Sequence, residues 1–505
     1  MDQPVKTLEG LVSGIPGKDA SVTVFKGIPY AAPPIGDLRW AVPKAPAAWQ
    51  GIRKADKFSA SCIQNIVQER KPWTYEFMAH DAVSEDCLYL NIWTAAKRSD
   101  EKRPVFVFLH GGGFTEGSGS VPVYDGEGLA KKGLVMVTIN YRLGAFGFLS
   151  HPELTKESGH NASGNYGLLD QVAALQWIHD NIAAFGGDPS RVTVAGQSAG
   201  SMSVHALIAS PLAKGLFHRA IAESGGSTLG SSSRNLADAE GDGVRFATSK
   251  GADLLAALRA MTAEQVAAPV QGVRFGPIVD GYFLPASIDE IVAQGKQNDV
   301  PILTGANADE GGGSPNPNTK LAAFQAQAKQ RYGEGADEFL KLYSASTDQE
   351  AGLATNDGSR DQQRMSIYVW ALNRAKTSKT RAYTYFWTHT LPGPDAGRFG
   401  AFHTSEVPYA LNTLYMSDCP FTEIDFKIAD LMSSYWANFA KSGDPNGKGL
   451  PAWPAVGEKP ATTMQVGDIT EAIPVTSTPA KLAFWQQYYS RPRPPQPALI
   501  MPASR

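Results

Sequence analysis

Four short apolar segments, separated by helical stretches, constrain the fold of this 505-residue chain most strongly. They are "RPVFVFLH" (103–110), "GLVMVTINYR" (133–142), "RVTVAG" (191–196) and "VPILTGAN" (300–307). Each is mostly apolar and bounded by glycine or polar residues, as expected of a strand buried on both faces. Parallel strands need crossover connections, so the alternation predicts an α/β fold with a mostly parallel central sheet and helices on both faces.

The longest predicted helix covers residues 166–185, "YGLLDQVAALQWIHDNIAAF", whose apolar residues recur every three to four positions. The "FGGDP" sequence that follows is expected to end it. No repeat or low-complexity tract divides the chain, so we expect residues 1–505 to form a single domain with large loop insertions. Turn-forming residues predict surface loops at 228–236 and 311–319, and a Pro-rich tail at 491–505.

The charge balance excludes several classes of function. The chain has 46 basic and 49 acidic residues and a net charge of −3, which gives no reason to expect a nucleic-acid partner. No apolar run approaches the roughly 18 residues needed to span a membrane. The chain has no CxxC spacing and no Cys/His cluster of the zinc type, so we expect no metal and no other cofactor.

The three cysteines, Cys62, Cys87 and Cys419, leave two alternatives. Either all three are buried thiols, or Cys62 and Cys87 form a disulfide and Cys419 is free. Spacing alone does not decide between them.

The stretch "GQSAG" (196–200) lies where the strand "RVTVA" gives way to the helix "SMSVHALIAS". A serine hydroxyl is a weak nucleophile unless a sharp turn projects it toward a base, and this context is typical of such a turn. Ser198 is therefore the candidate nucleophile, and the free N–H of Ala199 at the helix start would face developing negative charge. A structural turn that merely packs strand against helix is the alternative.

A second glycine-rich segment supports the catalytic interpretation. In "FLHGGGF" (108–114) three glycines directly follow a strand, where absent side chains let backbone N–H groups face a ligand. We expect Gly112 and Gly113 to complete an oxyanion hole with Ala199. Without the neighbouring GQSAG motif, a run of glycines could equally indicate a flexible loop.

The base must be one of nine histidines, and in this fold it follows the nucleophile and the acid along the chain. His205 is seven residues along the same helix, about 10 Å from Ser198, and is too far. His218 leaves little room for an intervening acid. His389, at the end of "YTYFWTHT", and His403, in a loop, remain, and the loop is favoured.

The residues alone also leave the identity of the catalytic acid undecided. Glu310 follows the strand "VPILTGAN", at the sheet edge where catalytic groups gather. Asp309 and Asp280 each follow an apolar run as well, and each could simply cap a turn.

The chain resembles a known family, the type-B carboxylesterases. This family has the α/β-hydrolase fold and includes the cholinesterases. Matching segments run through most of the chain. They include "FKGIPYAAPPIGDLRW", "SEDCLYLNIWT", "HGGGF", "NYRLGAFGFL", "GNYGLLDQVAALQWI", "NIAAFGGDPSRVTVAGQSAG", "ADEG", "FHTSEVPYAL" and "FAKSGDPNG". Within the family, the chain looks most like the bacterial para-nitrobenzyl-esterase-like members.

The resemblance implies a Ser-His-Glu triad in a serine carboxylesterase that acts on neutral small-molecule esters. Position by position, Ser198 is the nucleophile, Glu310 the acid and His403 the base. The resemblance further implies an oxyanion hole from Gly112, Gly113 and Ala199. It also places Ser224 and Glu406 as polar groups near the triad.

The resemblance also implies a Cys62–Cys87 disulfide, which suits an oxidising compartment. The first ten residues resemble a mature N-terminus behind an added Met, so we expect a periplasmic or secreted protein whose signal has been removed. If the given N-terminus is native, a cytoplasmic location is expected instead. We expect a monomer or a weak homo-oligomer.

Two departures separate the chain from cholinesterases. Gln197 stands where they have Glu, and Phe77 where they have Trp, which argues against a choline site. A carbamate or amide hydrolase with the same triad is the alternative enzyme. A non-catalytic adhesion protein is the alternative from another class, but such relatives have lost the triad that this chain keeps.

Overall fold

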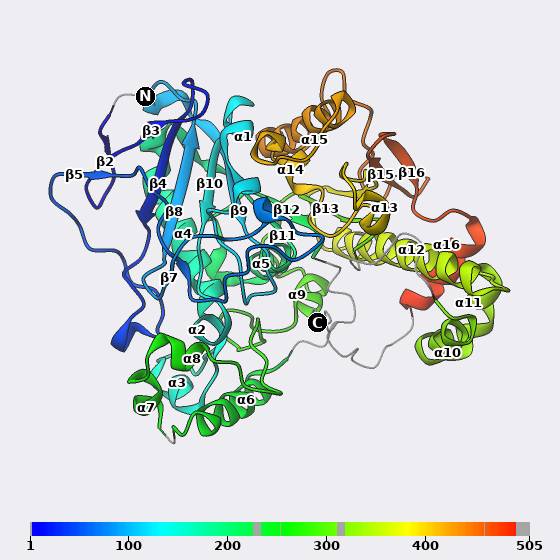
Figure 1. Cartoon of the computed structure of the whole chain (residues 1–505), viewed down its shortest axis with the longest axis horizontal. Helices are drawn as coiled ribbons and strands as arrows, with labels where there is room; N and C mark the ends of the chain where they lie inside the picture. The colour runs from blue at the N-terminus through cyan, green and yellow to red at the C-terminus, as the bar shows by residue number, and fades with distance from the viewer. Residues whose placement is uncertain (1–2, 226–233, 253, 311–318, 459, 491–505) are drawn as a thin grey trace.

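A computed structural model of the chain describes residues 3–225, 234–252, 254–310, 319–458 and 460–490. Within them, a large twisted sheet runs through the molecule in the order β16-β15-β14-β13-β12-β11-β9-β10-β8-β4-β3 (Figure 1). These strands are β3 (Ile15–Pro16), β4 (Thr23–Pro29), β8 (Tyr89–Thr94), β9 (Arg103–Leu109), β10 (Val135–Ile139), β11 (Gly187–Gln197), β12 (Arg219–Glu223), β13 (Ile302–Asn307), β14 (Ala382–Trp387), β15 (Thr462–Val466) and β16 (Glu471–Pro474).

The centre of this sheet is parallel and its edges are antiparallel. From β10 through β9, β11, β12, β13 and β14 to β15, each neighbouring pair is parallel. The strands β8, β4 and β3 at one edge and β16 at the other pair antiparallel. All four strands predicted from the sequence lie in the parallel centre, so the predicted fold class is confirmed.

Strand β9 illustrates why the central strands are apolar throughout. Val105, Val107 and Leu109 face one core, which they share with α4 (Tyr166–Asn181) and α5 (Ala199–Ala209). Phe106 and Phe108 face the opposite core, which includes α1 (Glu127–Lys131) and α15 (Glu423–Ser442). Successive side chains point to opposite faces, so a strand covered by helices on both sides must be apolar at every position.

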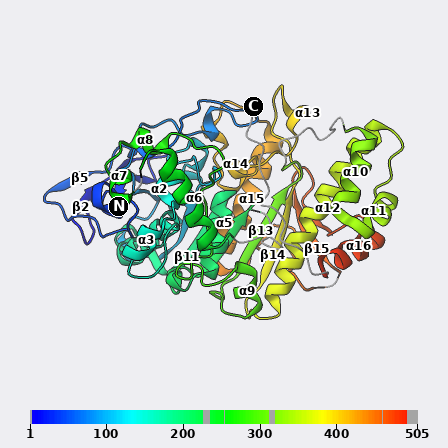
Figure 2. The ribbon, with the colours of Figure 1, turned by 90° about the horizontal axis from the view of Figure 1, so that it is seen from below.

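A further helical group packs at one end of the molecule. Helices α10 (Leu321–Tyr332), α11 (Ala336–Leu342) and α16 (Pro479–Ser490) lie together beyond the long α12 (Asp348–Ala375), at the end opposite β2 and β5 (Figures 1 and 2). Their aromatic side chains form a core of their own around Phe339 and Trp485. The other helices and strands are β1 (Val5–Lys6), β2 (Leu11–Ser13), β5 (Ile52–Lys54), β6 (Ser61–Cys62), β7 (Val83–Ser84), α2 (Gly144–Phe148), α3 (Pro152–Glu157), α6 (Leu236–Ser249), α7 (Leu255–Arg259), α8 (Ala263–Ala267), α9 (Ile288–Ala293), α13 (Ala396–Phe399) and α14 (Val407–Ala410).

The predicted helix at 166–185 and the strand after it differ from the structure only at their junction. The α-helix ends at Asn181 and continues as a 3₁₀ turn over Ile182–Phe185, closed by Gly186 in the left-handed region at φ 80°. Strand β11 then begins at Gly187, before the predicted start at 191. Its pairing with β9 breaks between Gly187 and Val192, a stretch in which Pro189 offers no N–H to the ladder.

Three predicted segments fall on residues that the structure does not describe. The loop predicted at 228–236 is described only from 234, and the loop at 311–319 only at 319. The Pro-rich tail at 491–505 lies wholly outside the described residues.

Cys62 and Cys87 form the disulfide that the family resemblance implies, with their Cα atoms 5.0 Å apart. The short parallel pair β6–β7 lies at the two ends of the enclosed segment. Cys419 is free, its thiol donates to the carbonyl of Pro392 at 2.8 Å, and burial raises its pKa to about 11. The bridge therefore closes a loop of chain, whereas Cys419 is an unreactive thiol at neutral pH.

Removing the bridge should destabilise the fold without touching the sheet. The disulfide joins residues separated by 25 positions, and closing such a loop stabilises by about 3 kcal/mol in the chain-entropy model. The double variant Cys62→Ser/Cys87→Ser should lower the free energy of unfolding by about that amount in denaturant titrations. Cys419→Ser is the control and should leave it nearly unchanged.

Thiol titration of the unfolded, unreduced protein gives an independent check. One free thiol per chain is expected, and three would contradict the bridge.

Candidate active site

The turn at Ser198, between β11 and α5, carries the candidate nucleophile. Ser198 has φ 57° and ψ −120°, a conformation that L-residues rarely adopt. Its N–H donates to the carbonyl of Glu223 at 2.9 Å, which ties the turn to the neighbouring strand β12. The backbone strain is therefore held by the sheet, and Ser198 stands at the N-terminus of α5.

The two glycines of GQSAG are required because the backbone around this turn is crowded. A Cβ atom at Gly200 would lie 2.0 Å from the carbonyl oxygen of Leu109, at the end of β9. A Cβ atom at Gly196 would lie 2.6 Å from the carbonyl carbon of Gly200. Only glycine lets β11, α5 and the end of β9 approach so closely.

The glycine-rich segment after β9 lies directly against the Ser198 turn. A Cβ atom at Gly111 would meet the Cβ of Ser198 at 3.0 Å, while Gly112 and Gly113 have φ values of 103° and 62°. In the described part of the chain, the N–H groups of Gly112, Gly113 and Ala199 donate to no other protein group. Three backbone donors are thus unused on segments that meet at Ser198.

Polar contacts hold this glycine loop in place. The amide side chain of Gln64 donates to the carbonyl of Gly117 at 2.7 Å and accepts from its N–H at 2.7 Å. The Tyr141 hydroxyl donates to the carbonyl of His110 at 2.7 Å, and the two rings stack. The loop is fixed from both ends, as preorganised donors require.

His403 and Glu310 form a hydrogen-bonded pair, although they are far apart in the sequence. Glu310 follows β13, and its Oε2 contacts Nδ1 of His403. The other oxygen, Oε1, accepts from the backbone N–H of Asn307 at 2.8 Å. The carboxylate is therefore oriented by the strand end, and it in turn orients the imidazole.

The rival residues are engaged elsewhere. His389 lies between Asp425 and Asp468, at 2.9 and 2.6 Å. Asp309 accepts from Arg360 at 2.7 Å, and Asp280 accepts from the backbone N–H groups of Tyr282 and Leu284. The remaining two candidates, His205 and His218, are also separate from the Glu310 pair: His205 packs edge-on against Trp370, and His218 accepts from the N–H of Val192.

Gln197 makes a contact with His403 that sequence reasoning missed. Its buried amide nitrogen lies 3.2 Å from Nε2 and 3.5 Å from Nδ1 of His403, so it sits beside the imidazole ring. The carboxylate of Glu310 accepts at Nδ1, which places the imidazole proton there and leaves Nε2 as the acceptor. Within the described residues, no hydrogen bond joins the Ser198 hydroxyl to His403.

The electrostatics of His403 reflect two opposing effects. Burial disfavours the imidazolium and lowers the pKa, whereas the charge and hydrogen bond of Glu310, with the charge of Glu406, raise it. The carboxylates prevail, so the pKa of His403 lies above its usual value.

Ser224 and Glu406, placed near the triad by the family resemblance, form a buried network beside it. The Ser224 hydroxyl donates to Glu406 at 3.1 Å, and the Asn307 amide donates to the other carboxylate oxygen. Burial, together with the charge of Glu310, raises the pKa of Glu406 to about 7.

A further buried acid, Glu223, extends this network. It accepts from the indole N–H of Trp436 at 2.7 Å, and its other oxygen has no partner among the described residues. Burial and the charge of Glu406 raise the pKa of Glu223 well above its usual range. A signal was present in the sequence, because Glu223 is a charged residue at the end of an apolar strand.

The disulfide-closed loop also reaches the site. The indole N–H of Trp73 donates to the backbone carbonyl of His403 at 3.0 Å. Phe77 is buried edge-on against Phe402, the residue before His403. The segment between Cys62 and Cys87 therefore contacts the histidine loop through Trp73 and the glycine loop through Gln64.

In the described residues, no group of three or more His, Cys, Asp or Glu side chains is arranged to hold a metal ion. The described helices include none with the length and apolarity to cross a bilayer.

Comparison with known proteins places this chain in one family. The model of the carboxylesterase family matches residues 2–485. Fumonisin B1 esterase of Sphingopyxis macrogoltabida is 38% identical over 469 residues, covering 89% of this chain and 83% of the relative. Human cocaine esterase is 34% identical, covering 89% and 86%, and rabbit liver carboxylesterase 1 is 33% identical, covering 96% and 93%.

The chain therefore belongs to the carboxylesterase family. It is a serine carboxylesterase, a carboxylic ester hydrolase of the α/β-hydrolase fold. The closer likeness to para-nitrobenzyl esterases stays a prediction.

The contact of Gln197 with His403 predicts a change in pH dependence. A general base works when neutral, so kcat/KM should fall as pH drops through the pKa of His403, with a midpoint above the usual 6.5. In Gln197→Glu a carboxylate beside Nε2 should raise that pKa and move the acidic limb up by about one unit.

Gln197→Met is the matched control, because it keeps the side-chain length without the charge and should show no upward shift. An acidic limb at the same pH in wild type and Gln197→Glu would contradict the contact.

Proposed function

We propose that Ser198, His403 and Glu310 act as the catalytic triad, and that Gly112, Gly113 and Ala199 form the oxyanion hole. The pairing of His403 with Glu310, on loops that converge at the carboxyl edge of the sheet, is the observation that carries this proposal. The strained turn at Ser198 and the three unused N–H groups support it.

In the first half-reaction, His403 Nε2 accepts the Ser198 proton as the oxygen attacks the ester carbonyl. The N–H groups of Gly112, Gly113 and Ala199 stabilise the tetrahedral oxyanion. The imidazolium then protonates the leaving alcohol, and the acyl group remains on Ser198.

Water repeats the sequence on the acyl-enzyme: His403 takes its proton, the acid is released and Ser198 regains its hydrogen. Glu310 orients the imidazole and stabilises its positive charge without taking the proton. Ser224 and Glu406 act as positioning residues, since they fix the strand ends that carry Glu310 and His403.

Neutral small-molecule esters are the substrates we propose. The residue before the nucleophile is an uncharged amide, and Phe77 packs against Phe402, so these two positions give a cation little attraction. A carbamate or amide hydrolase would use the same acyl chemistry and is the alternative. The contact of His403 with Glu310 argues against a non-catalytic binding protein.

We further propose a periplasmic or secreted location, because the Cys62–Cys87 bridge persists in oxidising compartments. We expect the chain to form one domain, in line with the family match over residues 2–485. We expect it to act as a monomer or a weak homo-oligomer.

Removing the Ser198 hydroxyl or the His403 imidazole should abolish most of the esterase activity. Ser198→Ala and His403→Ala should each lower kcat by about 10⁴ to 10⁶, and the double variant should be little worse, because the groups act as a unit. Hydrolysis of p-nitrophenyl butyrate measures this.

Ser190→Ala, on the same strand as the turn, and His179→Ala, half-exposed on α4, are matched controls that should keep wild-type activity. If Ser198→Ala kept more than about a tenth of the wild-type rate, the assignment would fail.

The neutral-ester proposal is tested with a pair of near-isosteric substrates. The value of kcat/KM for butyrylcholine should be no higher than for 3,3-dimethylbutyl butyrate, because a quaternary ammonium gains little beside Gln197 and Phe77. A preference of about tenfold or more for the cation, weakening in high salt, would show instead a cation-selective site.

A further inference from the structure

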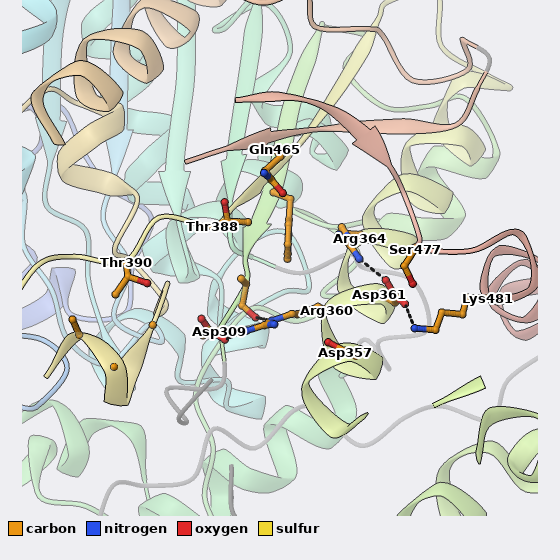
Figure 3. Close-up of a pocket in the computed structure, with 15 residues that line it drawn as sticks. Asp309, Asp357, Arg360, Asp361, Arg364, Thr388, Thr390, Gln465, Ser477 and Lys481 are labelled. Carbon is orange, nitrogen blue, oxygen red and sulfur yellow. Dashed lines mark hydrogen bonds and ion pairs between the residues drawn. The ribbon is translucent and has the colours of Figure 1, made fainter. Parts of the chain in front are cut away.

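A cavity of about 550 Å³ lies beside the histidine loop, on the side toward α12 and α16 (Figure 3). Its wall combines residues that follow β13 and β14 with side chains from the middle of α12 and with Lys481 of α16. Neither Ser198 nor His403 lines it. It is therefore a concave site separate from the proposed nucleophile.

Two ion pairs on the cavity wall have a more exposed cation and a more buried acid. Arg360 is 27% exposed and pairs with Asp309, which is 7% exposed. Arg364 is 13% exposed and pairs with Asp361, which is 3% exposed. In each pair the cation is the more accessible partner, so the charge presented to the cavity by these pairs is positive.

Lys481 adds a third cation whose partner is already satisfied. Its ammonium lies 3.6 Å from Asp361, which also accepts from Arg364 and, at 2.7 Å, from the Tyr343 hydroxyl. Lys481 is only 13% exposed and sits 4.2 Å from the centre of the Tyr343 ring. At that distance its donors are left for another acceptor.

Other donors are also unused. The Nε atom of Arg364 is buried without a partner among the described residues. The hydroxyl groups of Thr388, Thr390 and Ser477 line the cavity, and none makes a side-chain hydrogen bond within the described chain. Three acids on the wall, Asp309, Asp361 and the exposed Asp357, balance the three cations in number. The cavity thus offers several unused donors, without a net excess of charge.

Arg360 connects the cavity to the proposed triad. It donates to the carbonyl of Ala308 at 3.2 Å and to Asp309 at 2.7 Å, immediately before Glu310. Asp309 in turn accepts from the N–H of Ala401 at 2.9 Å, two residues before His403. A ligand that binds Arg360 would therefore displace groups in contact with both the segment that carries Glu310 and the loop that carries His403.

We infer that this cavity binds a small oxyanion, a carboxylate or phosphate compound, and that occupancy modulates the esterase through Arg360. Planar guanidinium groups and an ammonium are the donors that such anions prefer.

Direct binding to the full-length protein tests the inference independently of turnover. Isothermal titration with citrate, and separately with inorganic phosphate, at constant ionic strength should show saturable binding of at least one. Binding of citrate alone assigns carboxylates, and binding of phosphate alone assigns phosphoryl compounds.

Lys481→Met should weaken this binding about tenfold or more, as expected for loss of one charge-assisted hydrogen bond. Lys481→Arg, which keeps the charge, should retain it and guards against misfolding of the methionine variant. Lys427→Met, an exposed lysine on α15, is the matched control and should bind as wild type does.

The same anion should change kcat/KM for a neutral ester in wild type but much less in Lys481→Met. The inference is overturned if neither anion binds saturably, or if Lys481→Met binds as tightly as wild type. A failure of the proposed triad would appear in the Ser198 variants and leave these titrations unaffected.

Discussion

The strained backbone at Ser198 depends on the close approach of three segments. Strand β11, helix α5 and the end of β9 come so near that a Cβ atom at Gly200 would lie 2.0 Å from a carbonyl oxygen. The positive φ of Ser198 persists because the hydrogen bond to Glu223 and this packing over-determine it. The glycine loop and the N-terminus of α5 both meet at this turn.

The carboxyl groups near His403 are the second feature on which the proposed active site depends. The carboxyl groups of Glu310 and Glu406 act on the imidazole, and that of Glu223 lies near Glu406. Burial and the charge of Glu406 raise the pKa of Glu223 well above its usual range. Glu310, held by Asn307, is the acid that contacts the histidine directly.

The central sheet could be predicted because strands buried on both faces are apolar at every position, as in β9. The Ser198 turn could be predicted because glycines at 196 and 200 mark close backbone contacts between strand and helix. By contrast, spacing could not separate His389 from His403, since both follow β14 and only tertiary contacts distinguish them. His389 is bound by Asp425 and Asp468, which come from distant parts of the chain.

Other features were beyond sequence reasoning for the same reason. The hydrogen bond from Trp73 to His403 joins residues 330 positions apart, and the contact of Gln197 with His403 joins residues 206 apart. No local pattern encodes such pairs. The start of β11 was misplaced because the sequence "FGGDP" was expected only to end the helix, whereas the strand already begins within it and accommodates Pro189 at a break in pairing.

Covalent capture of the nucleophile tests the account most directly. A neutral fluorophosphonate reacts with a serine that has both an adjacent base and an oxyanion hole, and it stays attached. Intact-mass and peptide analysis should find one adduct per chain, on the peptide that contains Ser198, and none in Ser198→Ala. An adduct on another residue, or equal labelling of the variant, would contradict the central claim that the strained turn presents the nucleophile.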